Sequence, residues 1–396
     1  MQYSKKFEAI SPSPTLVIDS KFKEMKAQGH DVVGFGAGEP DYDTPNHIKQ
    51  AAINAILTGK TKYTPASGTM ELKKAICDKF QKDNDLSYTP ANIVVSNGAK
   101  HSLINAFGAI LNPGDEVIVP APFWVSYPEM IKLADGVPVI LKTKEENDFK
   151  ATAADFERML TPKTKAIVLN SPSNPTGMVY TKSELEAIAE FAVKNNIYVI
   201  SDEIYEKLIY EGEHISIASF GEEIKNLTII INGVSKTYAM TGWRIGFAAA
   251  NAEVAKAMAN VQSHAASNPN SIAQVAALAA LGGGEDEIEI MKSHFVKRRD
   301  YVVDEINKIE GVSCKKPQGA FYIMMSIADI CGKTLYGKTI ENADDFAELF
   351  LNKARVAVVP GTGFGAPEYV RWSYATAVEN IEEGLERLKK FLAEEY

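Results

Sequence analysis

A lysine follows closely on an apolar run in the second half of the chain. Residues 227–232 read LTIIIN, and Lys236 comes after a short GVS segment. Such a run is typical of a buried parallel strand, so Lys236 is expected just past its carboxyl end, where open α/β sheets bind ligands. In a cleft of that kind, burial and nearby cations lower the pKa of a lysine amine, which then acts as a nucleophile toward an aldehyde. A lysine without such neighbours is a solvated surface group.

Polar residues also follow three other apolar runs. Because the carboxyl ends of parallel strands meet at one edge of a sheet, we expect these residues to lie close to Lys236. Their convergence is more specific than any one motif. The four segments that follow the runs are NGAK (97–100), SPSNPTG (171–177), DEIY (202–205) and GVSK (233–236).

One of these segments, with two residues near Lys236, has the groups that bind a phosphate. Gly98, Ala99 and Lys100 open a predicted helix, and the backbone N–H groups of a helix N-terminus bind anions. Ser235 and Arg244 would add a hydroxyl and a guanidinium to that site. The alternative is an ordinary helix start without a ligand.

An aspartate and a tyrosine follow the strand predicted over residues 197–201. Asp202 either caps a helix or holds the protonated nitrogen of a heterocycle. Tyr205, three residues on, would share a helical face with Asp202, and otherwise serves only in packing. A phosphate grip, a partner for a ring nitrogen, a phenol and a nucleophilic lysine together predict a cleft for pyridoxal 5'-phosphate.

Two other kinds of site are disfavoured. Gly34, Gly36 and Gly38 suggest a dinucleotide fingerprint, but the pattern needs glycine where Glu39 stands and a strand-to-helix context that is missing. The histidines show no metal-ligand spacing, so we interpret them as structural and predict no metal. They stand at positions 30, 47, 101, 214, 264 and 294.

The composition is that of a globular protein and argues against polyanionic partners. The 396 residues are 45% hydrophobic, and their formal net charge is −9 without a long basic run. Nucleic acid and anionic membranes are therefore not expected as partners. The three cysteines are widely spaced, and neither a signal peptide nor a membrane span is evident, so we expect a cytoplasmic protein.

Alternation of short apolar runs with helix-period segments predicts an α/β fold. We expect a large domain over residues 46–285, with a mostly parallel seven-stranded sheet covered by helices. A smaller α+β domain would combine an N-terminal arm and helix, within residues 1–45, with residues 286–396. The runs that predict the large sheet are NIVVS (92–96), EVIVP (116–120), VPVIL (137–141), AIVLN (166–170), IYVIS (197–201), LTIII (227–231) and GFAAA (246–250).

A series of longer motifs runs through nearly the whole chain: GFGAGEPDYDTP, KYTPASG, FWVSYPEM, NSPSNPTG, SDEIYE, SKTYAMTGWRIG and VVPGTGFG followed by VRWSYA. Together they resemble the class I aminotransferases of fold type I, specifically the bacterial aspartate aminotransferase branch. The resemblance implies that Lys236 bonds the aldehyde of pyridoxal 5'-phosphate and that Asp202 pairs with its pyridine nitrogen. Tyr205 and Asn174 would hydrogen-bond the ring oxygen, and Trp124 would stack on the ring. The residues around the phosphate would be Gly98, Ala99, Lys100, Ser235, Arg244 and, from the neighbouring subunit, Tyr63.

The same resemblance implies a homodimer with shared active sites and a ping-pong exchange between amino acids and 2-oxo acids. The expected reaction is transfer of the amino group of L-aspartate to 2-oxoglutarate, with Lys236, Asp202 and Tyr205 as catalytic residues. The substrate contacts it implies are Gly38, Lys100, Trp124, Asn174 and Arg371.

Substrate choice rests on cations. Arg371 offers a planar fork that suits an α-carboxylate, whereas an acidic side chain needs a second cation. Residues 257–291 contain no Lys or Arg, so the resemblance assigns the distal carboxylate to Lys100, which otherwise only neutralises phosphate. Relatives that accept prephenate carry a basic residue where Ser11 stands, so prephenate is not expected.

Other reactions remain open. An aminotransferase of alanine or aromatic donors, or a pyridoxal-phosphate-dependent C–S lyase, would keep the same cofactor residues. A regulator that senses ligands with such a domain would carry an added DNA-binding domain, and we expect none.

Overall fold

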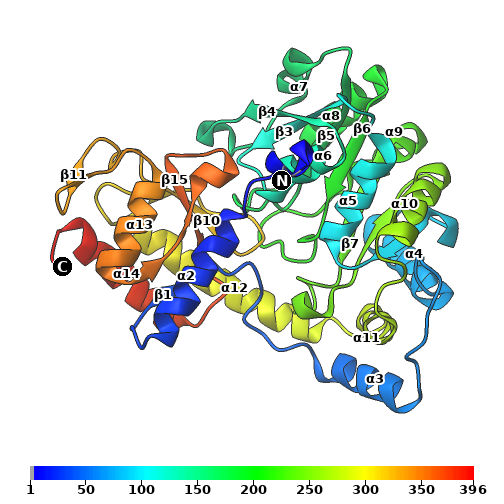
Figure 1. Ribbon diagram of the computed structural model, residues 1–396, viewed down its shortest axis with the longest axis horizontal. Helices are drawn as coiled ribbons and strands as arrows, with labels where there is room; N and C mark the ends of the chain where they lie inside the picture. The colour runs from blue at the N-terminus through cyan, green and yellow to red at the C-terminus, as the bar shows by residue number, and fades with distance from the viewer. Residues whose placement is uncertain (1–3) are drawn as a thin grey trace.

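Seven strands form the larger sheet, as the apolar runs predict. The computed structural model describes residues 4–396, and its strand order is β2-β8-β7-β6-β5-β3-β4. Figure 1 labels β3 to β7 of this sheet. Neighbouring strands run parallel from β4 to β7, and β8 is antiparallel to both of its neighbours. The bounds are β2 (Ile93–Ser96), β3 (Glu116–Ala121), β4 (Val137–Lys142), β5 (Thr164–Asn170), β6 (Tyr198–Asp202), β7 (Thr228–Gly233) and β8 (Gly246–Ala249).

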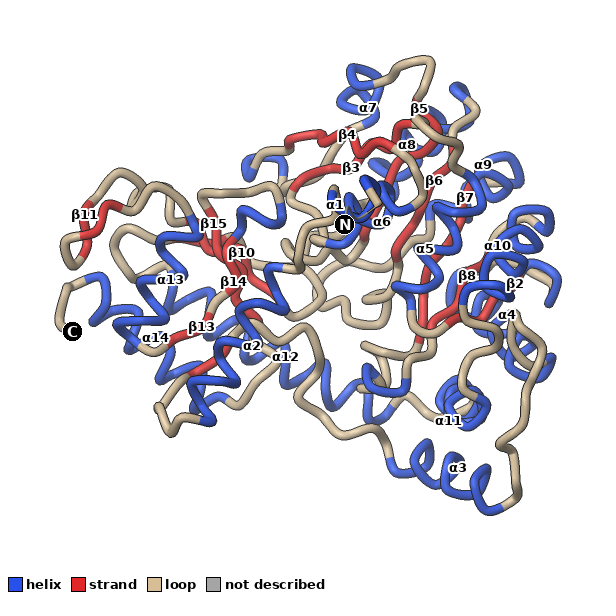
Figure 2. Tube along the Cα trace, in the orientation of Figure 1, coloured by secondary structure: helices blue, strands red, loops and turns tan. Residues whose placement is uncertain are grey.

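Helices cover both faces of this sheet, which explains why a central strand such as β7 is buried along its whole length (Figure 2). Alternate residues of a strand face opposite layers: Ile229 and Ile231 pack toward α5, and Ile230 packs on the other side. Burying such a side chain contributes about 1.5–3 kcal/mol. One layer holds α5 (Ala99–Ile110), α6 (Ser126–Leu133) and α10 (Ala252–Ala265), and the other holds α4 (Met70–Asn84), α8 (Lys182–Asn195), α9 (Glu222–Leu227) and α11 (Ser271–Leu281).

The sheet register brings the strand ends together. Asn170 at the end of β5 pairs with Asp202 at the end of β6. Ser96 and Gly233, which end β2 and β7, both pair with Gly246 at the start of β8. Residues that follow β2, β5, β6 and β7 therefore emerge at one edge of the sheet.

Gly246 allows α5 to begin directly over this edge. A Cβ atom on Gly246 would lie 2.2 Å from the backbone nitrogen of Ala99 and 2.4 Å from the carbonyl carbon of Gly98. No side chain fits at that distance, because it is well inside van der Waals contact. Glycine at the start of β8 is thus a condition for placing the N-terminus of α5 at the strand ends.

A second sheet is built from the C-terminal third of the chain. Its order is β14-β15-β10-β9, with all pairs antiparallel. The bounds here are β9 (Ser313–Cys314), β10 (Tyr322–Ser326), β14 (Val359–Pro360), β15 (Tyr369–Ser373), α12 (Asp286–Ile306), α13 (Ala343–Ala354) and α14 (Val378–Leu392), with a small hairpin of β11 (Thr334–Leu335) and β12 (Lys338–Thr339).

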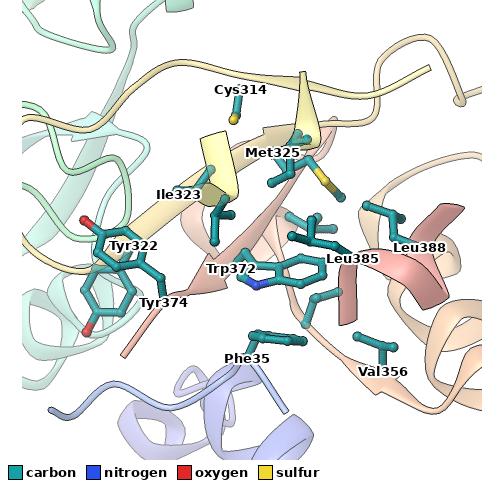
Figure 3. Packing of buried hydrophobic residues seen from close by; sticks show 14 of the residues in the cluster. Phe35, Cys314, Tyr322, Ile323, Met325, Val356, Trp372, Tyr374, Leu385 and Leu388 are labelled. Atoms are coloured by element: carbon teal, nitrogen blue, oxygen red, sulfur yellow. The ribbon is translucent and has the colours of Figure 1, made fainter. Parts of the chain in front are cut away.

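The N-terminal segment packs against this second sheet, as Figure 1 shows for α2 (Pro14–Ala27). β1 (Val33–Gly34) pairs in parallel with β13 (Val356–Ala357), and Met25 packs on Leu351. Figure 3 shows the Trp372 indole at the centre of the adjoining core, between Phe35 and the α14 side chain Leu385. The Phe35 and Trp372 ring centroids are 4.1 Å apart.

Before α2 the chain lies along the large sheet. A short helix, α1 (Lys5–Glu8), falls within the segment expected to be an arm, and it contacts α6. Lys6 Nζ lies 2.9 Å from Asp135, and the backbone N–H of Ser11 donates to Glu129. Residues 1–3 of the expected 1–45 segment lie outside the described residues. The remaining helix, α3 (Asn46–Leu57), packs on α11.

None of the helices between residues 4 and 396 combines the length and the apolar character that crossing a membrane requires.

Candidate active site

A cavity of about 470 Å³ opens where the strand ends of the large sheet face the second sheet. Most of the residues that the sequence singles out line it: Gly38, Ala99, Lys100, Trp124, Asn174, Asp202, Tyr205, Ser235, Lys236, Arg244 and Arg371. Gly98 lies directly behind Arg244. Tyr63 is the exception, because its side chain is 90% exposed and does not line the cavity of its own chain.

Lys236 lies in the turn that follows β7 and directs its amine into the cavity. Nζ donates to the carbonyl of Gly38 at 2.5 Å and lies 6.0 Å from the ring centre of Tyr205. Burial is the main reason that the pKa of Lys236 falls to about 8; Arg371 and Arg244 lower it further, and Glu39 opposes them. A fraction of this amine is therefore neutral near pH 7, as a nucleophile requires.

Asp202 ends β6 as a buried carboxyl, only 4% exposed. Its Oδ2 accepts a hydrogen bond from the Tyr127 hydroxyl at 2.7 Å, and Oδ1 accepts from the backbone N–H of Ile204 at 3.3 Å. Burial raises the pKa of Asp202 to about 6, although both hydrogen bonds work in the opposite direction. A cationic partner in the cavity would restore the ionised form.

Tyr205 lines the cavity, but the backbone that positions it is not the expected helix. The residues after Asp202 form a turn rather than a helix, so the predicted shared helical face is wrong. The turn forms because the backbone N–H of Ile204 bonds back to the Asp202 carboxylate instead of starting a helix. The Tyr205 hydroxyl lies 3.0 Å from that of Tyr322 on β10, which joins the two sheets across the cavity.

The start of α5 offers a cradle for an anion. Its N-cap, Gly98, has φ +85° and provides no side-chain cap, so the first turn is not closed by a neighbouring side chain. A Cβ on Gly98 would lie 2.5 Å from the Arg244 guanidinium, which packs directly over the glycine. Burial and the proximity of Arg244 lower the pKa of Lys100. Ser235 lines the same end of the cavity, so the donors there are those that phosphate prefers.

Arg371 is a buried cation on β15 with donors to spare. One terminal nitrogen donates to Asn174 Oδ1 at 3.0 Å and the other to the carbonyl of Gly36 at 2.9 Å. Its Nε is buried and has no hydrogen-bond partner among the described residues. The guanidinium stacks on the Tyr322 ring, 4.4 Å from its centre. A planar, partly unsatisfied guanidinium at a cavity wall is a receptor for a carboxylate.

Several cavity residues carry no signal in the sequence. Tyr322 reads as part of an apolar strand, and Tyr127 reads as packing on a helix. Ser13 and Thr15, whose hydroxyls are 2.8 Å apart, precede or begin α2 and line the cavity from the N-terminal segment. Their contribution depends on contacts between distant parts of the chain, which periodicity does not report.

A buried polar cluster lies beside the cavity residues without lining the cavity. Glu203, Glu206 and His214 hold their ligand atoms within 4.8 Å of one another, a grouping that their sequence spacing does not reveal. Lys79 Nζ already lies 2.5 Å from Glu206, and His214 Nε2 lies 3.1 Å from Glu203. These contacts form a buried polar network that contains the Lys79–Glu206 ion pair and a hydrogen bond between His214 and Glu203.

Comparisons with known proteins place the chain among amino-group transferases. The family described as aminotransferase class I and II matches residues 30–388. An aspartate aminotransferase of Bacillus sp. (strain YM-2) is 51% identical over 97% of this chain and 97% of its own. The crystal structure of the Rhizobium meliloti aspartate aminotransferase superimposes with a TM-score of 0.96 at 43% identity, covering 100% of this chain and 99% of that one. The Thermus thermophilus aspartate aminotransferase with maleate gives 0.94 at 44% identity, covering 99% and 100%.

Proposed function

From the premise that the chain belongs to the class I and II aminotransferases, we propose that it transfers the amino group of L-aspartate to 2-oxoglutarate with pyridoxal 5'-phosphate. The observation that carries the proposal is one cavity lined by a lysine of lowered pKa, a buried aspartate and a partly unsatisfied arginine. The donors and acceptors around this cavity match the groups of that cofactor and of an amino acid.

The cofactor would be held at both ends and on one face. Its phosphate suits the first turn of α5, with Ser235 and Arg244 as further donors. Asp202 is the acceptor for the pyridine nitrogen, and Trp124 provides a face for stacking. Tyr205 and Asn174 stand ready for the ring oxygen. When bound, pyridoxal phosphate supplies an aldehyde for the amino group and a ring that accepts electrons released at the substrate α-carbon.

Arg371 orients the substrate by its α-carboxylate. Two guanidinium nitrogens are fixed by Asn174 and Gly36, so the fork has little freedom to rotate. Gly38, whose carbonyl accepts from Lys236, lines the same cavity as Arg371. The arrangement fixes the α-carbon relative to the lysine amine, and such positioning is a large part of catalysis.

The Lys236 amine moves the proton. Once free, its neutral Nζ accepts a proton from the substrate α-carbon and later returns one, acting first as base and then as acid. A pKa of about 8 suits both roles near neutral pH. Asp202 stays charged when a cation sits opposite it, which favours a protonated ring nitrogen.

Lys100 accounts for the preference for a dicarboxylic donor. Its Nζ lies 4.8 Å from the ring centre of Trp124, at the wall of the cavity. Burial and Arg244 lower the pKa of Lys100, and a second carboxylate would favour its charged form. The Thermus thermophilus relative contains maleate, which is a dicarboxylate, and this supports the choice.

We further propose a homodimer whose sites are shared. The outer face of α3 exposes Ile53, Ile56 and Leu57, the last of them 77% exposed. Apolar side chains grouped in this way mark contact with another chain. Tyr63 follows α3 and is free to reach the phosphate site of a neighbouring subunit, as the family resemblance implies.

We also propose that the two parts of the chain have different roles. Residues 46–285 would bind the cofactor, and residues 286–396 with the N-terminal segment would complete the substrate site. The described cysteines form no disulfide, which fits a reducing cytoplasm.

The visible spectrum of the purified protein tests the proposal. The lysine-bound cofactor should be yellow, and L-aspartate without a keto acid should bleach that band more strongly than L-alanine or L-phenylalanine. Addition of 2-oxoglutarate should restore it. A yellow protein that responds only to another donor would move the substrate to that donor. A protein that pyridoxal phosphate cannot colour would refute the cofactor.

A further inference from the structure

Tyr127 connects two residues that face the cavity. It lies near the start of α6 and is only 2% exposed. Its hydroxyl donates to Asp202 Oδ2 at 2.7 Å, and its ring packs edge-on against Trp124, with centroids 5.4 Å apart and planes at 84°. One side chain thus contacts both the acceptor for a ring nitrogen and the stacking face.

We propose that Tyr127 is a positioning residue that holds the Asp202 carboxylate in its ionised form and in the orientation that meets the cofactor ring. This inference rests on the proposed function, because it assigns Tyr127 a role toward the partner of Asp202. Tyr127 acts through Asp202 and does not itself take part in the chemistry.

The Asp202 carboxylate depends on this one short bond. Among the residues that the structure describes, its oxygens accept from Tyr127 at 2.7 Å and from the Ile204 N–H at 3.3 Å. The backbone of Asp202 is fixed separately, since its carbonyl accepts from Asn170 Nδ2. Loss of the Tyr127 hydroxyl would therefore leave the carboxylate with only the longer contact to the Ile204 N–H, while the strand end stays in place.

The charge of Asp202 depends on the same bond. Burial raises the pKa of this carboxyl, and the Tyr127 hydrogen bond is the largest influence in the other direction. The charged groups that also act on it are Glu203, which raises the pKa, and Lys236, which lowers it. Asp202 in turn raises the pKa of Tyr205, after burial and Tyr322. Without the Tyr127 donor, a larger share of Asp202 would be protonated near neutral pH, and a protonated carboxyl cannot pair with a pyridinium.

A purely structural role for Tyr127 makes a different prediction. The residue belongs to the core cluster between the large sheet and the α5 layer. If packing were its whole contribution, removing the hydroxyl would lower stability, and any change in cofactor affinity would be the same at every pH. The pH dependence of cofactor binding therefore separates the two roles.

The experiment measures the affinity of the apoprotein for pyridoxal 5'-phosphate between pH 6 and pH 9. The proteins are wild type, Tyr127→Phe and Tyr180→Phe. Tyr180 is a matched control, because it is also buried, its hydroxyl takes part in one hydrogen bond, from the Ala151 N–H, and it does not line the cavity. Thermal unfolding of each apoprotein confirms that the variants fold.

We expect the ratio of the Tyr127→Phe Kd to the wild-type Kd to be about fivefold at pH 6 and to approach one by pH 9. These values follow from a rise of about one unit in the pKa of Asp202, which is a tenfold change in its ionisation equilibrium. The change in Lys236 protonation cancels in the ratio, because both proteins carry that lysine. Tyr180→Phe should match wild type throughout.

A double variant sharpens the test. Asparagine at position 202 cannot ionise. In the Asp202→Asn background, adding Tyr127→Phe should therefore change the affinity for pyridoxal 5'-phosphate by the same factor at every pH. A ratio that stays at one, or is equally raised at all pH values in the Asp202 background, overturns the inference while leaving the proposed function intact. A wild-type apoprotein that does not bind pyridoxal phosphate overturns the proposed function, and the inference with it.

Discussion

At the scale of single residues, the proposed function makes turnover depend on Lys236. We expect Lys236→Ala to lower kcat with L-aspartate by about 10²- to 10⁴-fold, because the amine that carries the proton is lost. Steady-state rates at saturating cofactor measure the effect. Lys256→Ala, an exposed lysine on α10, is the control and should keep wild-type rates. Repeated turnover by Lys236→Ala at the wild-type rate would exclude the assigned role.

Arg371 should show its importance in substrate recognition rather than in cofactor binding. Arg371→Lys keeps the charge but loses the planar fork, so kcat/KM for aspartate should fall roughly tenfold to a hundredfold. The affinity for pyridoxal phosphate should change little. The exposed Arg158, replaced by lysine, serves as the control. An unchanged kcat/KM would show that the α-carboxylate binds elsewhere.

The buried carboxylate of Asp202 lowers the stability of the folded apoprotein at neutral pH. Its pKa is about 6 in the folded chain against an ordinary value of 3.8, so the folded state favours the protonated form. The stabilisation linked to that proton is complete below about pH 4 and is lost as the pH rises to about 6. Asp202→Asn should therefore stabilise the apoprotein at pH 7 by up to about 3 kcal/mol while weakening cofactor binding.

Denaturant unfolding of the two apoproteins at pH 4.5 and at pH 7 checks this. The stability difference between Asp202→Asn and wild type should be larger at pH 7 than at pH 4.5. A difference that is independent of pH would show that Asp202 is not strained by its burial.

The sequence predicts which kinds of residue make up the site better than it predicts how their side chains contact one another. Lys236 and Asp202 could be identified because each follows an apolar run with a polar group out of place, whereas Arg371 is implied only by the resemblance of the longer motifs to a known family. Tyr127 and Tyr322 could not, because a buried tyrosine within an apolar segment looks like core until its hydroxyl is seen to meet Asp202 or Tyr205. Hydrogen-bond partners more than 70 residues apart leave no local pattern.

At the scale of secondary structure, apolar runs sufficed to predict all seven strands of the large sheet. The prediction failed for the turn after Asp202, since a side-chain acceptor there competes with the helix. An apolar run also does not report its partners: residues 356–360 form two strands, one paired with the N-terminal β1 and the other with β15.

The junction of α5 with β8 offers a test at this scale. We expect Gly246→Ala to destabilise the protein by about 1–3 kcal/mol, because the added methyl group would overlap the backbone at Ala99. Affinity for pyridoxal phosphate should fall as well, since the start of α5 must move. Gly284→Ala is the control, with nothing near its Cβ. Thermal melts and cofactor titrations measure both effects, and normal behaviour of Gly246→Ala would contradict the anion cradle.

At the scale of the whole molecule, the exposed face of α3 predicts the oligomeric state. Leu57→Glu should dissociate the homodimer, because it places a charge in an apolar contact. Sedimentation at micromolar concentration should show a monomer with weaker affinity for pyridoxal phosphate, because Tyr63 of the other subunit is then lost. Val378→Glu, an exposed position on α14, should leave the dimer intact. A monomeric wild-type protein would rule out the shared site.

The hydrogen bonds of Arg371 also bear on how the protein is made. This guanidinium meets Asn174, 197 positions earlier, and Gly36, 335 positions earlier. The groups proposed for the cofactor all lie before residue 245, whereas the carboxylate receptor needs residue 371 to fold back onto the beginning of the chain. On the proposed assignment, the carboxylate receptor is therefore completed only after the cofactor groups have emerged from the ribosome, because Arg371 is synthesised last of these residues.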